Sequence, residues 1–269
     1  MSEYETGVSL HEGGGKDPNE ILNERVLAYV LARRGRLEPG DLHYEAVTAV
    51  PADGRVYKAR RAWVAYALAA AAAGAVVDGA GAYGLGVTGL VALGMVLWVD
   101  LYGGLLHVVL DHPGHASHPV LGPVCVEFLW HHVLPYDIAL RSFADVCGDI
   151  SVLLGAHTAL AGFAAWLWPA LRPALSLCWG LAAGLGYCSQ WSHRRDHAHY
   201  HAPSAHAVHH RKLTESFTIL VHWTEPAIAW GRKRLGTSPD LWLGLWCAAS
   251  ALFVLGPAVL LHCATLAAI

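Results

Sequence analysis

The chain has 269 residues, of which 55% are hydrophobic and only 14% are charged, and its formal net charge is −3 at pH 7. Soluble domains usually carry about 25% charged residues, so this composition argues against an ordinary soluble domain and favours a membrane protein. The small negative charge gives no reason to expect a nucleic acid as partner. The length suits one domain. Histidine is unusually abundant, with 18 residues that outnumber the lysines and gather in clusters.

The most polar part of the chain is residues 1–60, where a helix-start signal at residues 17–20 and apolar residues at helical spacing predict short surface helices. The first twenty residues are acidic and lack the apolar core of a signal peptide. If this is the native start, import into an organelle is not expected.

Five uncharged or nearly uncharged apolar runs follow, and each approaches or exceeds the roughly 20 residues that a membrane-spanning helix needs. They are Ala62–Val77, Gly79–Leu110, Ile150–Leu171, Pro173–His193 and Leu241–Ile269. The glycine-rich residues 78–85 predict a turn between the first two helices. We therefore expect an all-α, multi-pass transmembrane helical bundle with four or five spans. Residues 61–238 would form its membrane domain, and residues 239–269 an additional C-terminal hydrophobic helix.

The basic residues predict how this bundle sits in the membrane. Arg55, Lys58, Arg60 and Arg61 precede the first run, and cytosolic segments are enriched in such residues. With a cytosolic N-terminus, the chain returns to the cytosol after the second and the fourth runs. The two histidine-rich segments, 107–132 and 193–210, then lie on the same cytosolic face.

The first of these segments begins with a stripe of spaced residues. Asp100, Gly104, His107 and Asp111 are separated by four, three and four positions, so they share one face of a helix. Acidic residues and histidines near the end of a span cost free energy unless their polar groups are paired, and they usually have a function. The alternative is that these side chains make polar contacts between helices and bind no metal.

The second segment carries the strongest motif, H-x-x-H-H, which places one histidine beside two others on a helix face. Imidazole suits iron, zinc and copper about equally, but one zinc ion takes only four ligands. The number of candidate metal ligands therefore favours two metal ions. The eight candidates are His107, His112, His131, His132, His193, His206, His209 and His210.

Three further histidines, His197, His199 and His201, lie in a hydrophilic stretch between the two motifs. We interpret this stretch as a loop, in which these side chains are solvated or hydrogen-bond to the ligands.

The order of these motifs resembles one family of lipid desaturases, which includes plasmanylethanolamine desaturase and the plastid desaturase that forms the trans-3 double bond of phosphatidylglycerol. The resemblance covers roughly residues 86–226. The family's D-x-x-x-G-x-x-H-x-x-x-D motif is matched by the stripe that starts at Asp100. The other matching positions are Phe128, His131, His132 and Pro135 (F-x-x-H-H-x-x-P), Trp191, Ser192 and His193 (W-S-H), and His206, His209 and His210 (H-x-x-H-H).

Two positions depart from the family pattern. Ser189 stands where the family has a further histidine, and one of His197, His199 and His201 could replace that ligand. The family's N-G-D-N segment appears here as Cys147, Gly148, Asp149 and Ile150, so only its glycine and aspartate are kept.

The resemblance implies an O2-dependent enzyme with two iron ions, which introduces a double bond into an alkyl or acyl chain of a phospholipid or ether lipid. It implies that Asp100, Asp111 and Asp149 act as hydrogen-bond partners around the ligands. Electrons would come from a donor such as cytochrome b5 or a ferredoxin. The expected location is the endoplasmic reticulum membrane, or the inner membrane of a bacterium.

Three alternatives stay open at this point. A lipid hydroxylase could use the same two irons. A zinc-dependent membrane hydrolase of the ceramidase type needs only three histidines and a water molecule. A non-catalytic membrane protein could bind metal through the same side chains.

Overall fold

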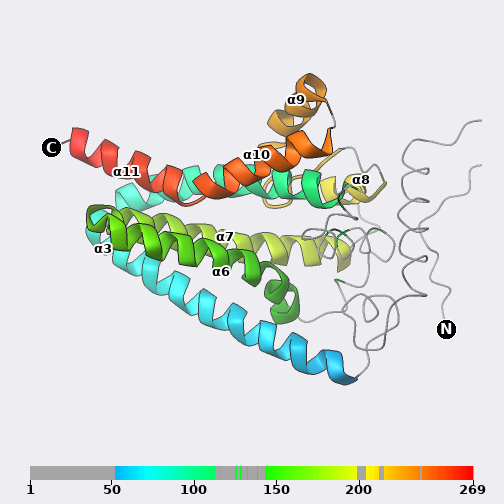
Figure 1. The fold of residues 1–269 in the computed structure, drawn as a ribbon, viewed down its shortest axis with the longest axis horizontal. Helices are drawn as coiled ribbons and strands as arrows, with labels where there is room; N and C mark the ends of the chain where they lie inside the picture. Colours follow the sequence, from blue (N-terminus) through cyan, green and yellow to red (C-terminus); the bar gives the residue numbers. More distant parts are fainter. Residues whose placement is uncertain are drawn as a thin grey trace, which may run out of the picture.

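The computed structural model describes residues 52–112, 143–198, 204–211, 215–236 and 238–268, together with positions 115, 125, 128, 132 and 138. These residues form helices and short connections, and no β-strand occurs among them (Figure 1). The expected all-α class is therefore confirmed for this part of the chain. The surface helices that we expect before residue 52 lie outside the described residues.

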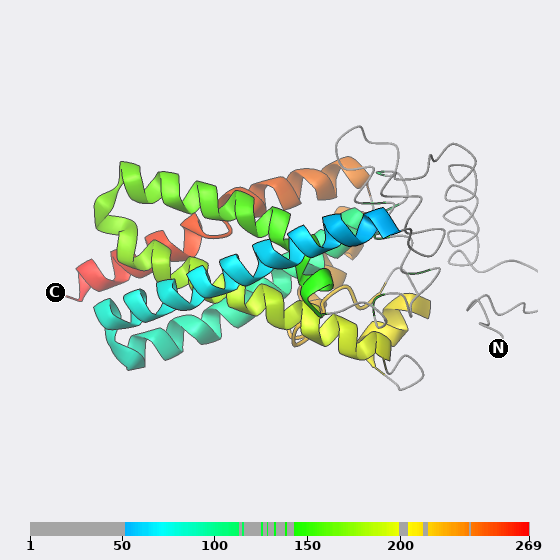
Figure 2. The same cartoon turned by 90° about the horizontal axis from the view of Figure 1, so that it is seen from below.

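The first described helix, α3 (Ala52–Leu110), contains a break at Gly84, whose backbone has φ 75° and ψ 164°. Only glycine adopts this region readily. The arms before and after Gly84 run in opposite directions, as Figures 1 and 2 both show, so α3 is a helical hairpin. Its turn lies within the predicted turn at residues 78–85. Residues 52–60, which we expected to be separate from the membrane domain, are continuous with the first arm.

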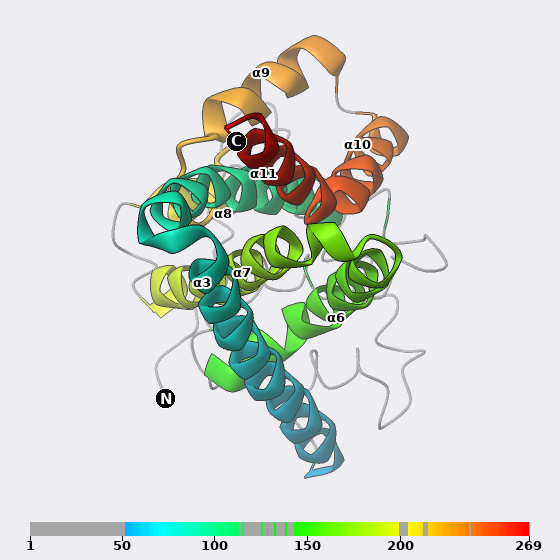
Figure 3. The same ribbon diagram turned by 90° about the vertical axis from the view of Figure 1, so that its left-hand side faces the viewer.

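The second hairpin consists of α6 (Phe143–Leu167) and α7 (Arg172–Ala198), joined by the short 3-10 helix η2 (Pro169–Leu171). Proline at the start of η2 and near the start of α7 is compatible with a helix beginning at each point. Seen end-on in Figure 3, α7 lies near the middle of the bundle, and it packs against α3, α6 and α11. The helix ends at Ala198, beyond the predicted end at His193. Our assignment of residues 194–198 to a loop was therefore wrong.

The remaining described helices are α8 (Ala205–Arg211), α9 (Glu225–Leu235), α10 (Pro239–Leu252) and α11 (Leu255–Ala267). The short helix α9 was not predicted. The C-terminal hydrophobic run is two helices rather than one, because α10 and α11 meet at an angle of 44°.

Large apolar side chains cover much of the outside of the bundle. Trp63, Val77, Leu85, Leu90 and Val152 are each at least 70% exposed, while the buried core between the helices contains many alanines. Exposed apolar surface on this scale marks contact with another apolar phase. Within the described residues, two helical stretches, Trp63–Leu110 and Val146–Leu167, are long and apolar enough to cross a membrane, and the bent pair α10 and α11 makes a third if it counts as one span. A membrane location fits these helices.

The histidine-rich segments meet at one end of this bundle. The second arm of α3 ends beside α8, and the last turns of α7 reach the same end, whereas the C-terminus lies at the opposite end (Figures 1 and 2). The fold thus brings the end of α3 to the last turns of α7 and to α8, which are distant from it in the sequence.

Candidate metal centre

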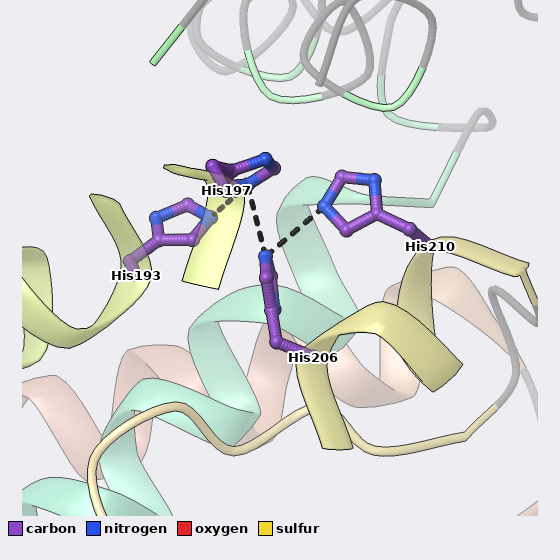
Figure 4. A group of neighbouring side chains, drawn as sticks. All are labelled: His193, His197, His206 and His210. Carbon is purple, nitrogen blue, oxygen red and sulfur yellow. Dashed lines mark hydrogen bonds between the residues drawn. The ribbon is translucent and has the colours of Figure 1, made fainter. Parts of the chain in front are cut away.

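Four buried histidines converge at the end of the bundle where α7 meets α8. His193 and His197 are one turn apart on α7, and His206 and His210 are one turn apart on α8. The Nε2 atoms of His193 and His197 are 3.0 Å apart, as are those of His197 and His206, and those of His206 and His210 (Figure 4). One ligand nitrogen from each of the four lies within 4.8 Å of all the others. This four-histidine group could hold a metal ion.

A second group adjoins it and consists of His107, Asp111 and His209, all buried, with ligand atoms again within 4.8 Å of one another. The Asp111 carboxylate lies 3.0 Å from Nε2 of His132 through Oδ1 and 3.1 Å from Nε2 of His209 through Oδ2. We call His107, Asp111 and His209 the histidine-aspartate group.

Backbone carbonyls fix which ring nitrogen faces this second group. Nδ1 of His209 lies 2.8 Å from the Glu215 carbonyl oxygen, and Nδ1 of His107 lies 3.3 Å from that of Gly103. A neutral imidazole that donates through Nδ1 presents a bare lone pair at Nε2. Nε2 of His209 faces Oδ2 of Asp111 3.1 Å away, and either a proton or a metal ion held there would satisfy both atoms. Nε2 of His107 is buried and has no hydrogen-bond partner within the described part of the chain. This arrangement suits a bound metal ion.

The two groups are close enough to form one centre. His206 and His209 lie on the same short helix with their rings 5.8 Å apart, and the rings of His107 and His193 are 5.9 Å apart. The H-x-x-H-H motif therefore serves both groups, with His206 and His210 on one side and His209 on the other. The chain thus places two groups of candidate metal ligands side by side.

The electrostatics favour the protonation states that metal ligands need. Burial would raise the pKa of Asp111, but the neighbouring His132, and hydrogen bonds from His132 and His209, hold that pKa well below its usual range. Burial, and then the nearby His193 and His197, lower the pKa of His206 well below its usual value. A deprotonated carboxylate and neutral imidazoles are the forms that bind cations.

The structure places His197 differently from the prediction. We placed this residue in a loop as a solvated or hydrogen-bonding side chain, but it lies on α7 and is fully buried within the four-histidine group. It was also one of the three histidines that could replace the family histidine for which this chain has Ser189. Ser189 itself donates a hydrogen bond to the Gly186 carbonyl 2.7 Å away. The buried histidine pair on α7, His193 and His197, thus lies one turn nearer the end of the helix than the pair that the resemblance implies.

Asp100 does not hydrogen-bond to an imidazole, contrary to our expectation. Its Oδ1 accepts hydrogen bonds from the backbone N–H groups of Val221 and His222, and its Oδ2 accepts from the backbone and the hydroxyl of Thr224. Gly104, one turn further along α3, allows the same segment to approach, because a Cβ there would lie 2.8 Å from Cγ2 of Thr218. Asp100 and Gly104 therefore position the segment that carries Glu215, the hydrogen-bond partner of His209.

Of the remaining predicted residues, only His112 has its side chain in the described part of the chain, and it belongs to neither group. His112 is half-buried, with its ring 5.6 Å from that of His115, and the pKa of His112 is lowered by burial. His131, His199 and His201 lie outside the described residues, as does the side chain of Asp149. For these four residues the predicted roles stay predictions.

An apolar cavity of about 50 Å³ opens beside the centre. His107 and His193 line its end nearest to the metal-binding groups, and it runs between α3, α6 and α7 to Phe253, at the break between α10 and α11. Ser189 lies in its wall. A volume of about 10–15 Å³ holds one water, so the cavity is several water molecules in size.

No protein-family model, curated protein or solved structure matches this chain. The resemblance to lipid desaturases therefore stays a prediction, and the function is argued from the site itself.

Proposed function

We propose that this protein is an O2-dependent membrane oxidoreductase that uses two iron ions to introduce a double bond into a hydrocarbon chain of a membrane lipid. The observation that carries this proposal is the junction of two buried donor groups with an apolar cavity, in a bundle whose outer surface is apolar. A metal centre beside an apolar cavity, away from water, suits oxidation of unactivated C–H bonds.

The composition of the histidine-aspartate group supports iron. Two histidines and one carboxylate with open coordination positions are typical of non-haem iron enzymes that use O2. The four-histidine group alone would suit zinc or copper as well. A zinc hydrolase needs only three protein ligands and a water molecule, so the second donor group favours the two-metal oxidoreductase over the hydrolase. We assign Asp111 as a direct ligand, because its oxygens lie on the Nε2 side of His209.

When bound, the two irons would supply the oxidising chemistry. In the overall reaction, O2 accepts two electrons from the two C–H bonds that are broken and two from an external donor, and two protons from solution complete two molecules of water. His107 and His193 place the metal-binding groups at one end of the cavity. The apolar walls hold the chain and exclude water. Oxygen insertion instead of a second hydrogen loss would give an alcohol, so the products distinguish a desaturase from a hydroxylase.

The membrane topology is part of this proposal. Because α3 turns back at Gly84, we propose that its two arms cross the membrane separately, and with α6, α7 and the α10–α11 pair this makes five crossings. The centre would face the cytosol, at the endoplasmic reticulum or the inner membrane of a bacterium. Arg232, Lys233 and Arg234 form a basic last turn of α9, and Arg232 interacts electrostatically with Asp111. This turn could attract an acidic electron donor such as cytochrome b5 or a ferredoxin.

Metal content with matched variants tests the proposal. We expect about two irons per chain in the purified full-length protein. His206→Ala should remove the ion of the four-histidine group, and His209→Ala should remove the other. His262→Ala is the control, because His262 lies on α11 at the opposite end of the bundle. Lipids from cells that express the protein should gain species two hydrogens lighter, and neither ligand variant should produce them.

The alternatives give different results in the same experiment. One zinc ion per chain with lipid hydrolysis would support the hydrolase. Two irons with products one oxygen heavier would support the hydroxylase. Loss of iron in His262→Ala to the same extent as in His206→Ala would mean that the histidine groups are not the metal site.

A further inference from the structure

We propose that Phe253 limits the length of hydrocarbon chain that the cavity accepts beyond the reacting carbon. This inference rests on the proposed function, because it treats the cavity as the site of a lipid chain. It concerns the C-terminal helices α10 and α11, to which the histidine centre assigns no role.

One end of the cavity lies at the candidate metal-binding groups, which we call the metal end, and the other end is closed. Along α3 its wall runs from His107 through Gly103 to Val99, a distance of about 12 Å for eight residues of helix. The α6 wall ends at His157, which lies farthest from the centre because α6 runs in the opposite direction. Phe253 lines the cavity at this level, where its ring lies 4.8 Å from that of His157. A chain that enters at the metal end therefore meets Phe253 at the other.

Phe253 is held firmly in place. Its carbonyl oxygen, at the break between α10 and α11, accepts a hydrogen bond of 2.8 Å from Nε1 of Trp98. Its ring stacks on that of Tyr102 with centroids 4.0 Å apart, and the Tyr102 hydroxyl lies 2.9 Å from Oγ of Ser250. Phe253 is only 3% exposed. Phe253 is thus held by its backbone, by α3 and by α6, and a side chain held in this way can act as a rigid stop.

A much larger apolar space lies on the other side of this stop. A groove of about 410 Å³ runs between α3 and α11, lined by Met95, Trp98, Pro257 and Leu261 among others. Trp98 faces this groove, Phe253 faces the cavity, and their rings stack with centroids 6.5 Å apart. The two rings form the partition between cavity and groove. Reducing Phe253 should join the two spaces and admit longer chains.

Competitive lipid binding tests this without any requirement for catalysis. The full-length protein in detergent is offered pairs of saturated single-chain phosphocholines that differ by two methylenes, and native mass spectrometry measures which one is retained. Each buried methylene should tighten binding about fourfold, until the chain reaches Phe253 and the gain stops. Phe253→Ala should move this limit to longer chains, and Phe253→Trp should move it to shorter ones.

Shifts in opposite directions cannot result from misfolding, which would weaken binding of every chain length. Phe163→Ala is the matched control, because Phe163 is 57% exposed on α6, and its limit should equal that of the unaltered protein. An unchanged limit in both Phe253 variants would overturn the inference. A limit that moves in a protein without iron or O2 consumption would support the stop and overturn the proposed enzyme. Desaturation with the same chain-length preference in every variant would support the proposed enzyme and overturn the role of Phe253 as a stop.

Discussion

Replacing Asp100 with asparagine should destabilise the protein and weaken metal binding by the histidine-aspartate group. The Asp100 carboxylate is buried and accepts four hydrogen bonds, of 3.0 and 3.3 Å at Oδ1 and 3.1 and 2.7 Å at Oδ2. An amide keeps one oxygen, and its NH2 group would face the two donors of Thr224. The hydroxyl of Thr224 can rotate to accept, but its backbone N–H cannot.

The magnitude follows from these contacts. One buried unsatisfied donor costs about 1–3 kcal/mol, and two charge-assisted hydrogen bonds that become neutral lose about 1 kcal/mol each. The free energy of unfolding should therefore fall by about 3–5 kcal/mol. At about 2–4 °C per kcal/mol for a chain of this size, the melting temperature should fall by about 6–20 °C.

The assay is thermal unfolding of the purified protein in detergent, combined with iron analysis. The control is Asp240→Asn, because Asp240 is exposed in the first turn of α10 and its substitution should leave the melting temperature unchanged. The iron content of Asp100→Asn should fall, since the segment that Asp100 holds carries the Glu215 carbonyl that orients His209. If both asparagine variants have the melting temperature of the unaltered protein, our interpretation of Asp100 is refuted.

Three further changes have predicted outcomes. His197→Ala should reduce the iron content by one ion per chain, as measured by elemental analysis, because it removes one of four converging nitrogens; loss of neither ion would exclude His197 as a ligand. Gly84→Ala should lower the melting temperature, because its backbone conformation costs other residues about 1–3 kcal/mol, whereas Gly81→Ala, whose Cβ would meet open space within a helix, should not; equal melting temperatures would argue against a strained turn at Gly84. Removal of the metal by a chelator should also lower the melting temperature, since a ligand at a hundred times its dissociation constant stabilises the folded state by about 2.7 kcal/mol; identical melting curves with and without metal would mean that the buried histidines bind no ion.

The sequence was sufficient to predict the helical class and that several of the named histidines lie together. The H-x-x-H-H spacing predicts that three histidines share a helix, and they do so on α8. The run of apolar residues broken by glycines predicts a helical hairpin near residue 84, and the turn is there. These predictions succeed because they depend on local spacing, which the geometry of the helix fixes directly.

The predictions that failed depended on contacts between distant parts of the chain. Asp100 shares a helix face with His107, but its hydrogen-bond partners are more than 120 positions away, in a segment without a recognisable motif. His197 lies among Arg194, Arg195 and Asp196, and such charged residues suggest a loop. The helix continues because its buried face there is formed by histidines instead of apolar residues, so the usual signal of amphipathic spacing is hidden.

The carbonyl partners of His107 and His209 have a consequence for metal selection. A ring whose Nδ1 is already bonded to the backbone has lost its rotational freedom before any ion arrives. Binding then need not overcome the about 0.5–1.5 kcal/mol of entropy that immobilising a flexible side chain costs. The same rigidity limits how far the donors can move to suit ions of different size. A preorganised donor set of this kind selects its ion by the coordination geometry that the ion accepts, instead of by intrinsic affinity, which would favour copper.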